Sequence, residues 1–254
     1  MFSKIKHFIF DLVFPKNCIG CGEEGDWICE KCLCSIDIIK EPFCPECRKP
    51  TMIGEFCEDC SVRGGQRPLD GIFICANFGD GVLREMIHQF KYNFIFDIGE
   101  TLGKIVVGKL KHLSTETLKQ ENKNIPQFDL IIPVPLYKKR KKWRGFNQAE
   151  ILGRVICRDL IYQIPDEQNP VFNKNILIKK KNTIQQAELN REERLRNLEG
   201  VFVVETQNFV SLREKNILLV DDITTTGSTL EECARVLKES GAKNVWGIVL
   251  AKGK

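Results

Sequence analysis

The sequence has 254 residues, of which 43% are hydrophobic and 28% are charged, so it holds enough apolar material for one well-buried α/β domain and a smaller second module. The formal net charge of +4 is too small to identify a nucleic-acid-binding protein, so such a function would need a local cluster of charge. No stretch reaches the roughly 18 uncharged apolar residues that a membrane-spanning helix needs, and no transmembrane segment is expected.

Residues 1–15 are predicted to form an amphipathic helix. Asp11 interrupts the apolar run, and no small-residue cleavage site follows, so the segment differs from a signal peptide. We expect it to pack on the main domain, with a peripheral membrane role as the alternative, and we predict a cytoplasmic location. The apolar side chains at helical spacing are Phe2, Ile5, Phe8, Ile9, Leu12 and Val13.

Four CxxC pairs lie within residues 18–60. A CxxC bend lets two thiolates reach one tetrahedral zinc at about 2.3 Å, and eight thiolates complete two sites with no open position for a substrate. We therefore predict two structural zinc ions, whose binding supplies folding energy to a segment with few large apolar residues. Sequential pairing of neighbouring CxxC motifs is the simplest way to share the two ions, but interleaved pairing uses the same residues. The alternatives to zinc are disulfides or a redox CxxC. The predicted ligands are Cys18, Cys21, Cys29, Cys32, Cys44, Cys47, Cys57 and Cys60.

Cysteine density divides the chain near Gly64 and Gly65, because nine of the twelve cysteines precede that pair. We predict the helix and zinc module in residues 1–65 and an α/β domain in residues 66–254. The length of the chain and the spacing of its cysteines favour a reducing compartment over a disulfide scaffold. The cysteines outside the four pairs are expected to be packing residues; they are Cys34, Cys75, Cys157 and Cys233.

Strand and helix patterns alternate through residues 66–254, which predicts a mostly parallel sheet with helices on both faces. The polar residues 114–127 are expected to form a solvated connection. The expected strands are residues 72–78, 129–135, 176–178, 201–204, 216–220 and 244–251. The expected helices are residues 82–90, 98–113, 148–162, 191–198 and 230–240.

Residues 217–229, ILLVDDITTTGST, combine a buried strand, an acidic pair and a threonine-rich loop before a helix. The strand is expected to end at Asp221 and Asp222, whose carboxylates then emerge at the carboxyl edge of the sheet, where open α/β sheets bind ligands. Gly227 allows a tight turn, and successive amides and hydroxyls face an anion at the positive end of the next helix. The pattern indicates a monoester phosphate beside sugar hydroxyls or a metal; an ordinary turn with an Asp or Thr cap is the alternative.

This segment resembles the signature of the type I phosphoribosyltransferases, which have the same order of strand, acidic pair and loop. The resemblance implies that fold and a site for phosphoribosyl pyrophosphate (PRPP) with magnesium. It makes Asp221 and Asp222 the catalytic pair, which holds the ribose 2- and 3-hydroxyls directly or through magnesium-bound water. It places the 5-phosphate on Thr224, Thr225, Thr226, Gly227, Ser228 and Thr229, and a pyrophosphate turn at Val134, Pro135 and Leu136.

Further strings narrow the resemblance to the ComF family, and they cover essentially the whole chain. They are PVPLYKKRKKWRGFNQAE, QQAELNREERLRNLEGVF, the FKYN segment around Lys91 and the CxxC-rich start. Lys142 and Trp143 before the matched Arg144 depart from the family pattern, and no hood that selects an acceptor base is recognisable. Members of this family are associated with DNA uptake in naturally competent bacteria, and some are described simply as phosphoribosyltransferases or as gluconate-related, GntX-like proteins.

Residues 137–147 are dense in basic and aromatic side chains and are expected to form a flexible loop. This loop would stabilise a leaving pyrophosphate, or contact single-stranded DNA by charge and by stacking on Tyr137, Trp143 and Phe146. A solvated mobile loop is the alternative. The candidate pyrophosphate residues here are Arg140, Arg144, Gly145 and Asn147. The candidate DNA contacts are Lys138, Lys139, Lys141, Lys142 and Trp143.

The sequence therefore predicts a PRPP-binding, phosphoribosyltransferase-like protein of the ComF type that acts in natural competence and handles incoming single-stranded DNA. One alternative is a housekeeping PRPP-dependent transferase that moves ribose 5-phosphate to an unidentified base or amine. Another is a non-catalytic PRPP sensor whose zinc module docks a partner protein. The expected partners are PRPP, single-stranded DNA and DNA-uptake or recombination proteins. Catalysis and the acceptor stay open, because His7, His88 and His112 lie in none of the matched motifs.

Overall fold

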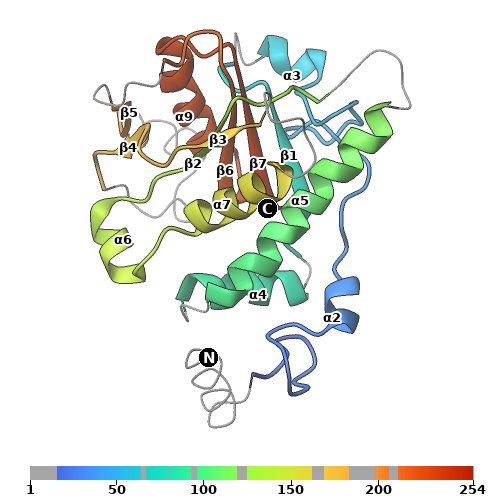
Figure 1. The fold of residues 1–254 in the computed structure, drawn as a ribbon. Coiled ribbons are helices and arrows are strands. Elements are labelled where there is room, and N and C mark those ends of the chain that lie inside the picture. The colour runs from blue at the N-terminus through green and yellow to red at the C-terminus, as the bar shows by residue number, and fades with distance from the viewer. Residues whose placement is uncertain are drawn as a thin grey trace.

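The fold, a computed structural model, is described for residues 16–63, 67–79, 81–92, 96–118, 125–161, 169–182, 198, 200–205 and 211–253 (Figure 1). The predicted N-terminal helix and most of the helix predicted for residues 191–198 lie outside these residues. Within them, no helix combines the length and the apolar character that crossing a membrane requires.

A five-stranded parallel sheet forms the centre of the α/β domain, with strand order β1-β7-β6-β2-β3. Its long strands come from continuous apolar runs, because a strand buried on both faces has no polar side. In β7, for example, every residue from Val245 to Ala251 is buried. The prediction of a mostly parallel sheet is confirmed. The strands are β1 (Gly71–Asn77), β2 (Leu130–Pro133), β3 (Val171–Phe172), β6 (Asn216–Thr224) and β7 (Asn244–Lys252).

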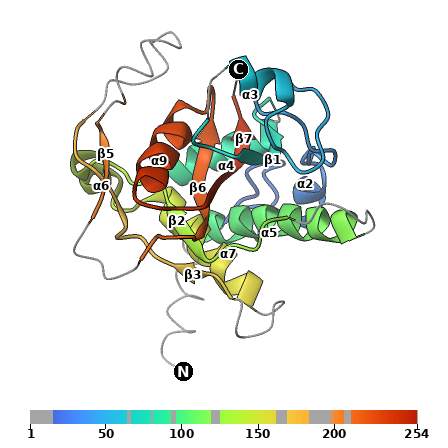
Figure 2. The same cartoon turned by 90° about the horizontal axis from the view of Figure 1, so that it is seen from above.

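Helices cover both faces of the sheet, as predicted (Figure 2). One face carries α4 (Gly81–Tyr92), α5 (Phe96–Leu118) and α7 (Gln148–Ile161), and the other carries α9 (Ser228–Glu239). Side chains alternate between the two faces along β6. Leu218 and Val220 belong to the buried cluster that includes α4, α5 and α7, whereas Leu219 belongs to the cluster that includes α9.

Several elements differ from the expectation. α5 continues to Leu118, so residues 114–118 of the expected connection are helical. The basic stretch expected to be a flexible loop contains a helix, α6 (Lys138–Arg144). Lysine and arginine favour helix, and Gly145, with a φ of +73°, ends α6 in the left-handed conformation. The elements that the sequence does not predict are β3, α2 (Glu30–Cys34) and α3 (Glu58–Arg63).

A separate antiparallel sheet of two strands, β4 (Leu177–Lys179) and β5 (Phe202–Val204), lies beside α9 (Figure 1). Leu177 and Phe202 belong to the same buried cluster as Leu230 and Leu237 of α9. This small sheet is therefore fixed to the face of the domain that carries α9.

The cysteine-rich module covers the outer edge of β1, the last strand of the sheet. Ile38 forms an antiparallel bridge with Ala76, and the Ile72 N–H donates to the Gly54 carbonyl at 3.0 Å. An uncovered sheet edge invites pairing with another chain. The backbone of the module occupies this edge instead, so the module and the sheet are joined by main-chain hydrogen bonds.

A buried lysine of α5 holds the segment between the two halves of the module. Lys109 is 3% exposed, and its ammonium donates to the carbonyl oxygens of Ile39 at 2.5 Å and Lys40 at 3.0 Å. Burial lowers the pKa of Lys109, and the nearby Cys75 thiol and Glu41 carboxylate oppose that shift. Two carbonyls depend on this one side chain for a donor.

We predict that Lys109→Met lowers the free energy of unfolding by about 2 kcal/mol, because the carbonyls of Ile39 and Lys40 lose a charged donor. The matched control is Lys104→Met on the same helix. The Lys104 side chain is 63% exposed, so its loss should change stability by less than about 0.5 kcal/mol. Urea unfolding of the zinc-loaded protein measures both. Equal values for the two variants would contradict a supporting role for Lys109.

Candidate functional site

A cleft of about 750 Å³ opens at the carboxyl ends of β2 and β6. The structure brings most of the predicted site residues to this cleft, together with Lys91, Tyr92, Gln148, Lys179 and Asn182. The predicted residues that line it are Val134, Pro135, Leu136, Lys139, Arg140, Trp143, Arg144, Asn147, Asp221, Asp222, Thr224, Thr225, Gly227, Ser228 and Thr229. The predicted residues outside its lining are Lys138, Lys141, Lys142, Gly145 and Thr226.

The acidic pair lies inside β6, not after it. The expectation that the strand ends at the pair is wrong, because Asp221 pairs with Val249 of β7 and the ladder continues to Thr224. Consecutive side chains of a strand lie on opposite faces of the sheet. Asp222 therefore lies on the α4 side and Asp221 on the α9 side, and both reach the same cleft at the sheet edge.

Asp222 is paired with a lysine from the last turn of α4. The Lys91 ammonium lies 3.0 Å from Asp222 Oδ2, and the two side chains are 17% and 11% exposed. The FKYN segment around Lys91 contributes to the family resemblance, but the sequence gives that lysine no role. The missing information is tertiary, since only the packing of α4 on the sheet brings the two residues together.

Asp221 stays partly protonated near neutral pH. Burial raises the pKa of Asp221 to about 7, and the like charge of Asp222 adds to the rise, while Lys91 and Lys179 oppose it. Asp221 is half-buried and lines the cleft, so a cation in the cleft can reach it. The pair can therefore exchange a proton for a metal ion or accept hydrogen bonds from sugar hydroxyls.

The predicted phosphate loop leads directly into α9. Gly227 is the N-cap residue and has a φ of +87°, a conformation that favours glycine. Thr226 Oγ1 and Ser228 Oγ are 2.7 Å apart. The N-cap position is therefore glycine rather than the Asp or Thr of an ordinary capped turn. The positive end of α9 lies at the cleft, as anion binding requires.

Asn147 supports the turn after β2. Its Nδ2 donates to the Val134 carbonyl at 3.0 Å, and its Oδ1 accepts the Ala149 N–H at 3.2 Å. The side chain is 7% exposed. That Asn147 contacts pyrophosphate stays a prediction, and the structure shows that its amide group shapes the turn beside the cleft.

Two buried donors near the cleft lack hydrogen-bond partners among the described residues. They are Arg144 Nε and Gln148 Nε2, although Arg144 Nη1 itself donates to Gln148 Oε1 at 3.2 Å. The Arg144 guanidinium also lies over the Tyr92 ring, 5.4 Å from its centre. Buried donors without partners are costly, and a bound anion would satisfy both.

The aromatic residues of the basic stretch have different surroundings. Trp143 is 62% exposed and contacts Tyr92, with ring centres 6.1 Å apart. Phe146 is buried against Phe90, with ring centres 5.4 Å apart. The expectation that Phe146 stacks on a nucleic-acid base is therefore wrong, because this ring belongs to the core.

Two further polar residues line the cleft, Lys179 at the end of β4 and Asn182 in the segment that follows it. The Lys179 ammonium lies 5.2 Å from the centre of the Phe202 ring. Burial lowers the pKa of Lys179, and Arg140 across the cleft lowers it further. The sequence contains no recognisable hood that selects an acceptor base, and in the structure Lys179 and Asn182 line this part of the cleft.

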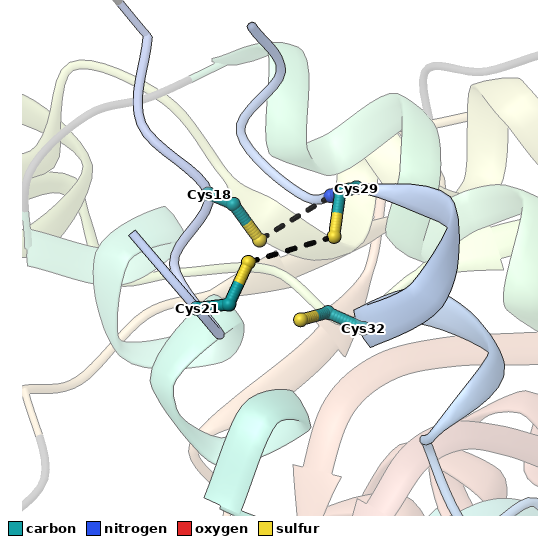
Figure 3. A group of neighbouring side chains, drawn as sticks. All are labelled: Cys18, Cys21, Cys29 and Cys32. Atoms are coloured by element: carbon teal, nitrogen blue, oxygen red, sulfur yellow. Dashed lines mark hydrogen bonds between the residues drawn. The ribbon is translucent and has the colours of Figure 1, made fainter. Parts of the chain in front are cut away.

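Each group of four cysteines forms a compact cluster. In the first cluster (Cys18, Cys21, Cys29 and Cys32; Figure 3) and in the second (Cys44, Cys47, Cys57 and Cys60), the sulfur atoms all lie within 4.8 Å of one another. The first CxxC pair therefore shares a cluster with the second, and the third with the fourth, which is the sequential pairing. Four converging thiols suit a closed tetrahedral zinc site, and two such sites indicate two zinc ions.

Backbone amides favour the thiolate form of the first cysteine in each cluster. Burial raises the pKa of Cys18, but amides of Cys29, Cys21 and Gly20 outweigh it and lower that pKa to about 6. The same balance lowers the pKa of Cys44 to about 7. Thiolates are the form that binds zinc, so these surroundings fit the metal.

The cysteines outside the clusters were all expected to be packing residues. Three of them are buried: Cys75, Cys157 and Cys233. The expectation is wrong for Cys34, which is exposed at the end of α2.

Comparison with known proteins finds two domain families. The model of the double zinc ribbon domain matches residues 9–61, and that of the phosphoribosyl transferase domain matches residues 153–254. The chain is 31% identical over 241 residues to Competence protein F of Haemophilus influenzae, covering 88% of this chain and 96% of that protein. It is 28% identical over 226 residues to Competence protein ComFC of Bacillus subtilis, covering 84% of this chain and 79% of the relative. It is also 28% identical over 223 residues to DNA utilization protein YhgH of Escherichia coli K12, covering 87% of this chain and 88% of that protein.

We predict that the Asp221 carboxyl of the metal-free protein titrates near pH 7, measured by carbon NMR of the aspartate side chains. Asp222→Asn should lower the midpoint because a like charge is removed, and Lys91→Met should raise it because a cation is removed. A raised pKa in the folded state also means that this carboxyl contributes less stability as the pH rises from about 4 to about 7. A midpoint below about 5, or shifts in the same direction in both variants, would contradict the proposed surroundings.

Proposed function

The chain belongs to the ComF family, and from this premise we propose that its cleft binds PRPP with magnesium. The observation that carries the proposal is the meeting of three features in one cleft. They are the Asp221–Asp222 pair, the loop that opens α9, and the buried donors Arg144 Nε and Gln148 Nε2, which have no partner in the described part of the chain. Each feature matches one part of the ligand. The acidic pair suits the ribose hydroxyls and a hard cation, the loop suits the 5-phosphate, and the unpaired donors suit the pyrophosphate.

We further infer that the site can transfer the ribose 5-phosphate group. In that reaction the bond from C1 to the pyrophosphate oxygen breaks, the electron pair leaves with pyrophosphate, and an acceptor nitrogen bonds to C1 and then loses a proton. Asp221 and Asp222 would hold the magnesium, which would neutralise charge on the leaving group. Arg144 would hold the departing anion. The wall formed by Lys179 and Asn182 would face the acceptor. Release of pyrophosphate separates a transferase from a non-catalytic sensor.

The test of PRPP binding is titration calorimetry with magnesium. We expect Asp221→Asn/Asp222→Asn to weaken binding at least about tenfold, because charge-assisted hydrogen bonds and metal ligands are lost. Asp97→Asn is the control, since the Asp97 side chain is 64% exposed at the start of α5 and remote from the cleft lining. Equal affinity in the wild type and the double variant would overturn the proposed donor site.

A role in handling incoming single-stranded DNA is the second part of the proposal. The names of the relatives refer to competence and to DNA utilization. Physical support comes from α6, where exposed lysines accompany an exposed Trp143. Lysines bind phosphates by charge, and an exposed indole can stack on an unpaired base. The basic face of α6, defined as Lys138, Lys142 and Trp143, is the proposed contact.

We predict that the affinity for single-stranded DNA falls with salt, and that Lys138→Ala/Lys142→Ala reduces the logarithmic salt slope by about 1.4, or about 0.7 for each phosphate contact. Trp143→Ala should weaken binding by about 1–3 kcal/mol if the indole stacks on a base. Lys104→Ala/Lys111→Ala on α5 is the charge-matched control and should leave the slope unchanged. Fluorescence anisotropy at several salt concentrations gives these values. An unchanged slope in the α6 variant would remove α6 from the proposal.

A further inference from the structure

The two cysteine clusters contact different parts of the α/β domain. Beside the first cluster, the start of α5 provides Asp97, which accepts from Trp27 Nε1 at 3.4 Å and pairs with the Lys16 ammonium at 3.2 Å. Beside the second cluster, the Lys252 ammonium at the end of β7 donates to the Pro45 carbonyl. Figure 1 shows the separation, because α2 and α3, which carry the last ligands of the two clusters, lie far apart.

Arg67 joins the second cluster to α9. Its side chain is 10% exposed, and its guanidinium carbon lies 4.3 Å from the centre of the Phe56 ring. Nε donates to the Cys60 carbonyl at 3.1 Å, and Nη2 donates to Glu46, which lies inside a CxxC bend. Nη1 donates to Glu231 of α9 at 2.5 Å. One guanidinium therefore contacts both bends of the second cluster and the first turn of α9.

Glu231, a partner of this guanidinium, is hydrogen-bonded to the phosphate loop. The Glu231 N–H donates to the Gly227 carbonyl at 2.9 Å, and the Glu231 side chain is 18% exposed. A second connection runs through Gly253, which follows Lys252 and donates its N–H to the Thr224 carbonyl at 2.8 Å. Both ends of the loop are thus joined to residues that contact the second cluster.

Metal binding decides whether this connection is rigid. Thiolate ligands hold two CxxC bends around one ion, and small zinc modules lose their fold when the metal is removed. The Cys60 carbonyl and the Glu46 carboxylate are held in place by those two bends. If the two bends lost their fold, the buried Arg67 would keep Glu231 as its partner but lose the Cys60 and Glu46 acceptors that fix its position. A planar guanidinium depends on acceptors placed in its own plane.

We propose that Arg67 is a positioning residue that couples metal binding in the second cluster to the geometry of the phosphate loop, an inference that rests on the proposed function. Zinc in the second cluster then strengthens PRPP binding, and by thermodynamic linkage PRPP strengthens zinc binding there by the same factor. The first cluster acts as an internal comparison. The residues beside it bond to Asp97 of α5, and its buried Cys18 and Cys32 pack in the core cluster that includes α4, so these contacts do not involve the phosphate loop.

The full chain with both zinc ions tests this coupling without a substitution. The protein is equilibrated with a zinc-selective chelator, with or without saturating PRPP and magnesium, and exposed thiols are then labelled in a short pulse and located by mass spectrometry. We expect PRPP to protect the second cluster at least about fivefold. Labelling of the first cluster should be unchanged. Protection is measured on thiols and does not depend on enzymatic activity.

Two substitutions test the residue itself. Arg67→Met and Glu231→Gln should each abolish the protection of the second cluster and weaken PRPP binding by a similar factor in calorimetry. Glu239→Gln is the matched control, since it removes a 60% exposed carboxylate from the far end of the same helix, and protection should remain.

The outcomes separate this inference from the proposed function. PRPP binding that protects both clusters equally or neither cluster would overturn the coupling and leave the donor site standing. Protection that survives in both Arg67→Met and Glu231→Gln would remove Arg67 from the path. No PRPP binding in the wild type would overturn the donor site and the coupling together.

Discussion

Parallel pairing of β6 with β2 on one side and β7 on the other places the parts of the cleft next to one another. The Val134 N–H donates to the Val220 carbonyl at 2.9 Å, so the ladder continues past β2 and sets the turn beside the acidic pair. On the other side, a Cβ at Gly247 of β7 would lie 2.9 Å from a methyl carbon of Leu230. α9 can approach the sheet only because this position has no side chain. The edge of the sheet therefore carries the turn, the acidic pair and the start of α9 together.

The charges of the cleft balance one another. Two carboxylates beside a phosphate loop would repel a polyanion, but Lys91 neutralises Asp222 and burial keeps Asp221 partly protonated near pH 7. Arg144 and Lys179 add positive charge to the lining of the cleft. Such an arrangement suits a ligand with phosphates at both ends and hydroxyls between them, since each end meets donors or cations and the middle meets carboxylates. This balance is the physical reason for proposing PRPP rather than a simple phosphate.

The parts of the fold that could be predicted depend on local pattern. Continuous apolar runs predicted the long strands, the four CxxC pairs predicted two clusters, and the order of acidic pair and Gly227 predicted the loop. The parts that could not be predicted depend on tertiary packing. Nothing local shows that Lys91 meets Asp222, or that Arg67 reaches Glu231 across the domain.

Two expectations about the basic stretch are wrong, for different reasons. A run of lysines suggests a solvated loop. Here lysine and arginine favour a helix, and the left-handed Gly145 ends it, so the segment forms α6. Phe146 reads as part of an aromatic surface, yet it follows the end of α6 and turns into the core against Phe90. The helix follows from local propensity, whereas the burial of Phe146 depends on packing outside the segment.

The measurement that tests the donor site most directly is a PRPP titration followed through backbone amide NMR shifts in the presence of magnesium. A phosphate bound at the loop should give its largest shifts at the amides of residues 225–229, with smaller ones at the amides of Val134 and Leu136. Ribose 5-phosphate alone should reproduce the first set but not the second. Shifts confined to α6 and the β4–β5 sheet, with residues 225–229 unmoved, would contradict a phosphate site at the start of α9.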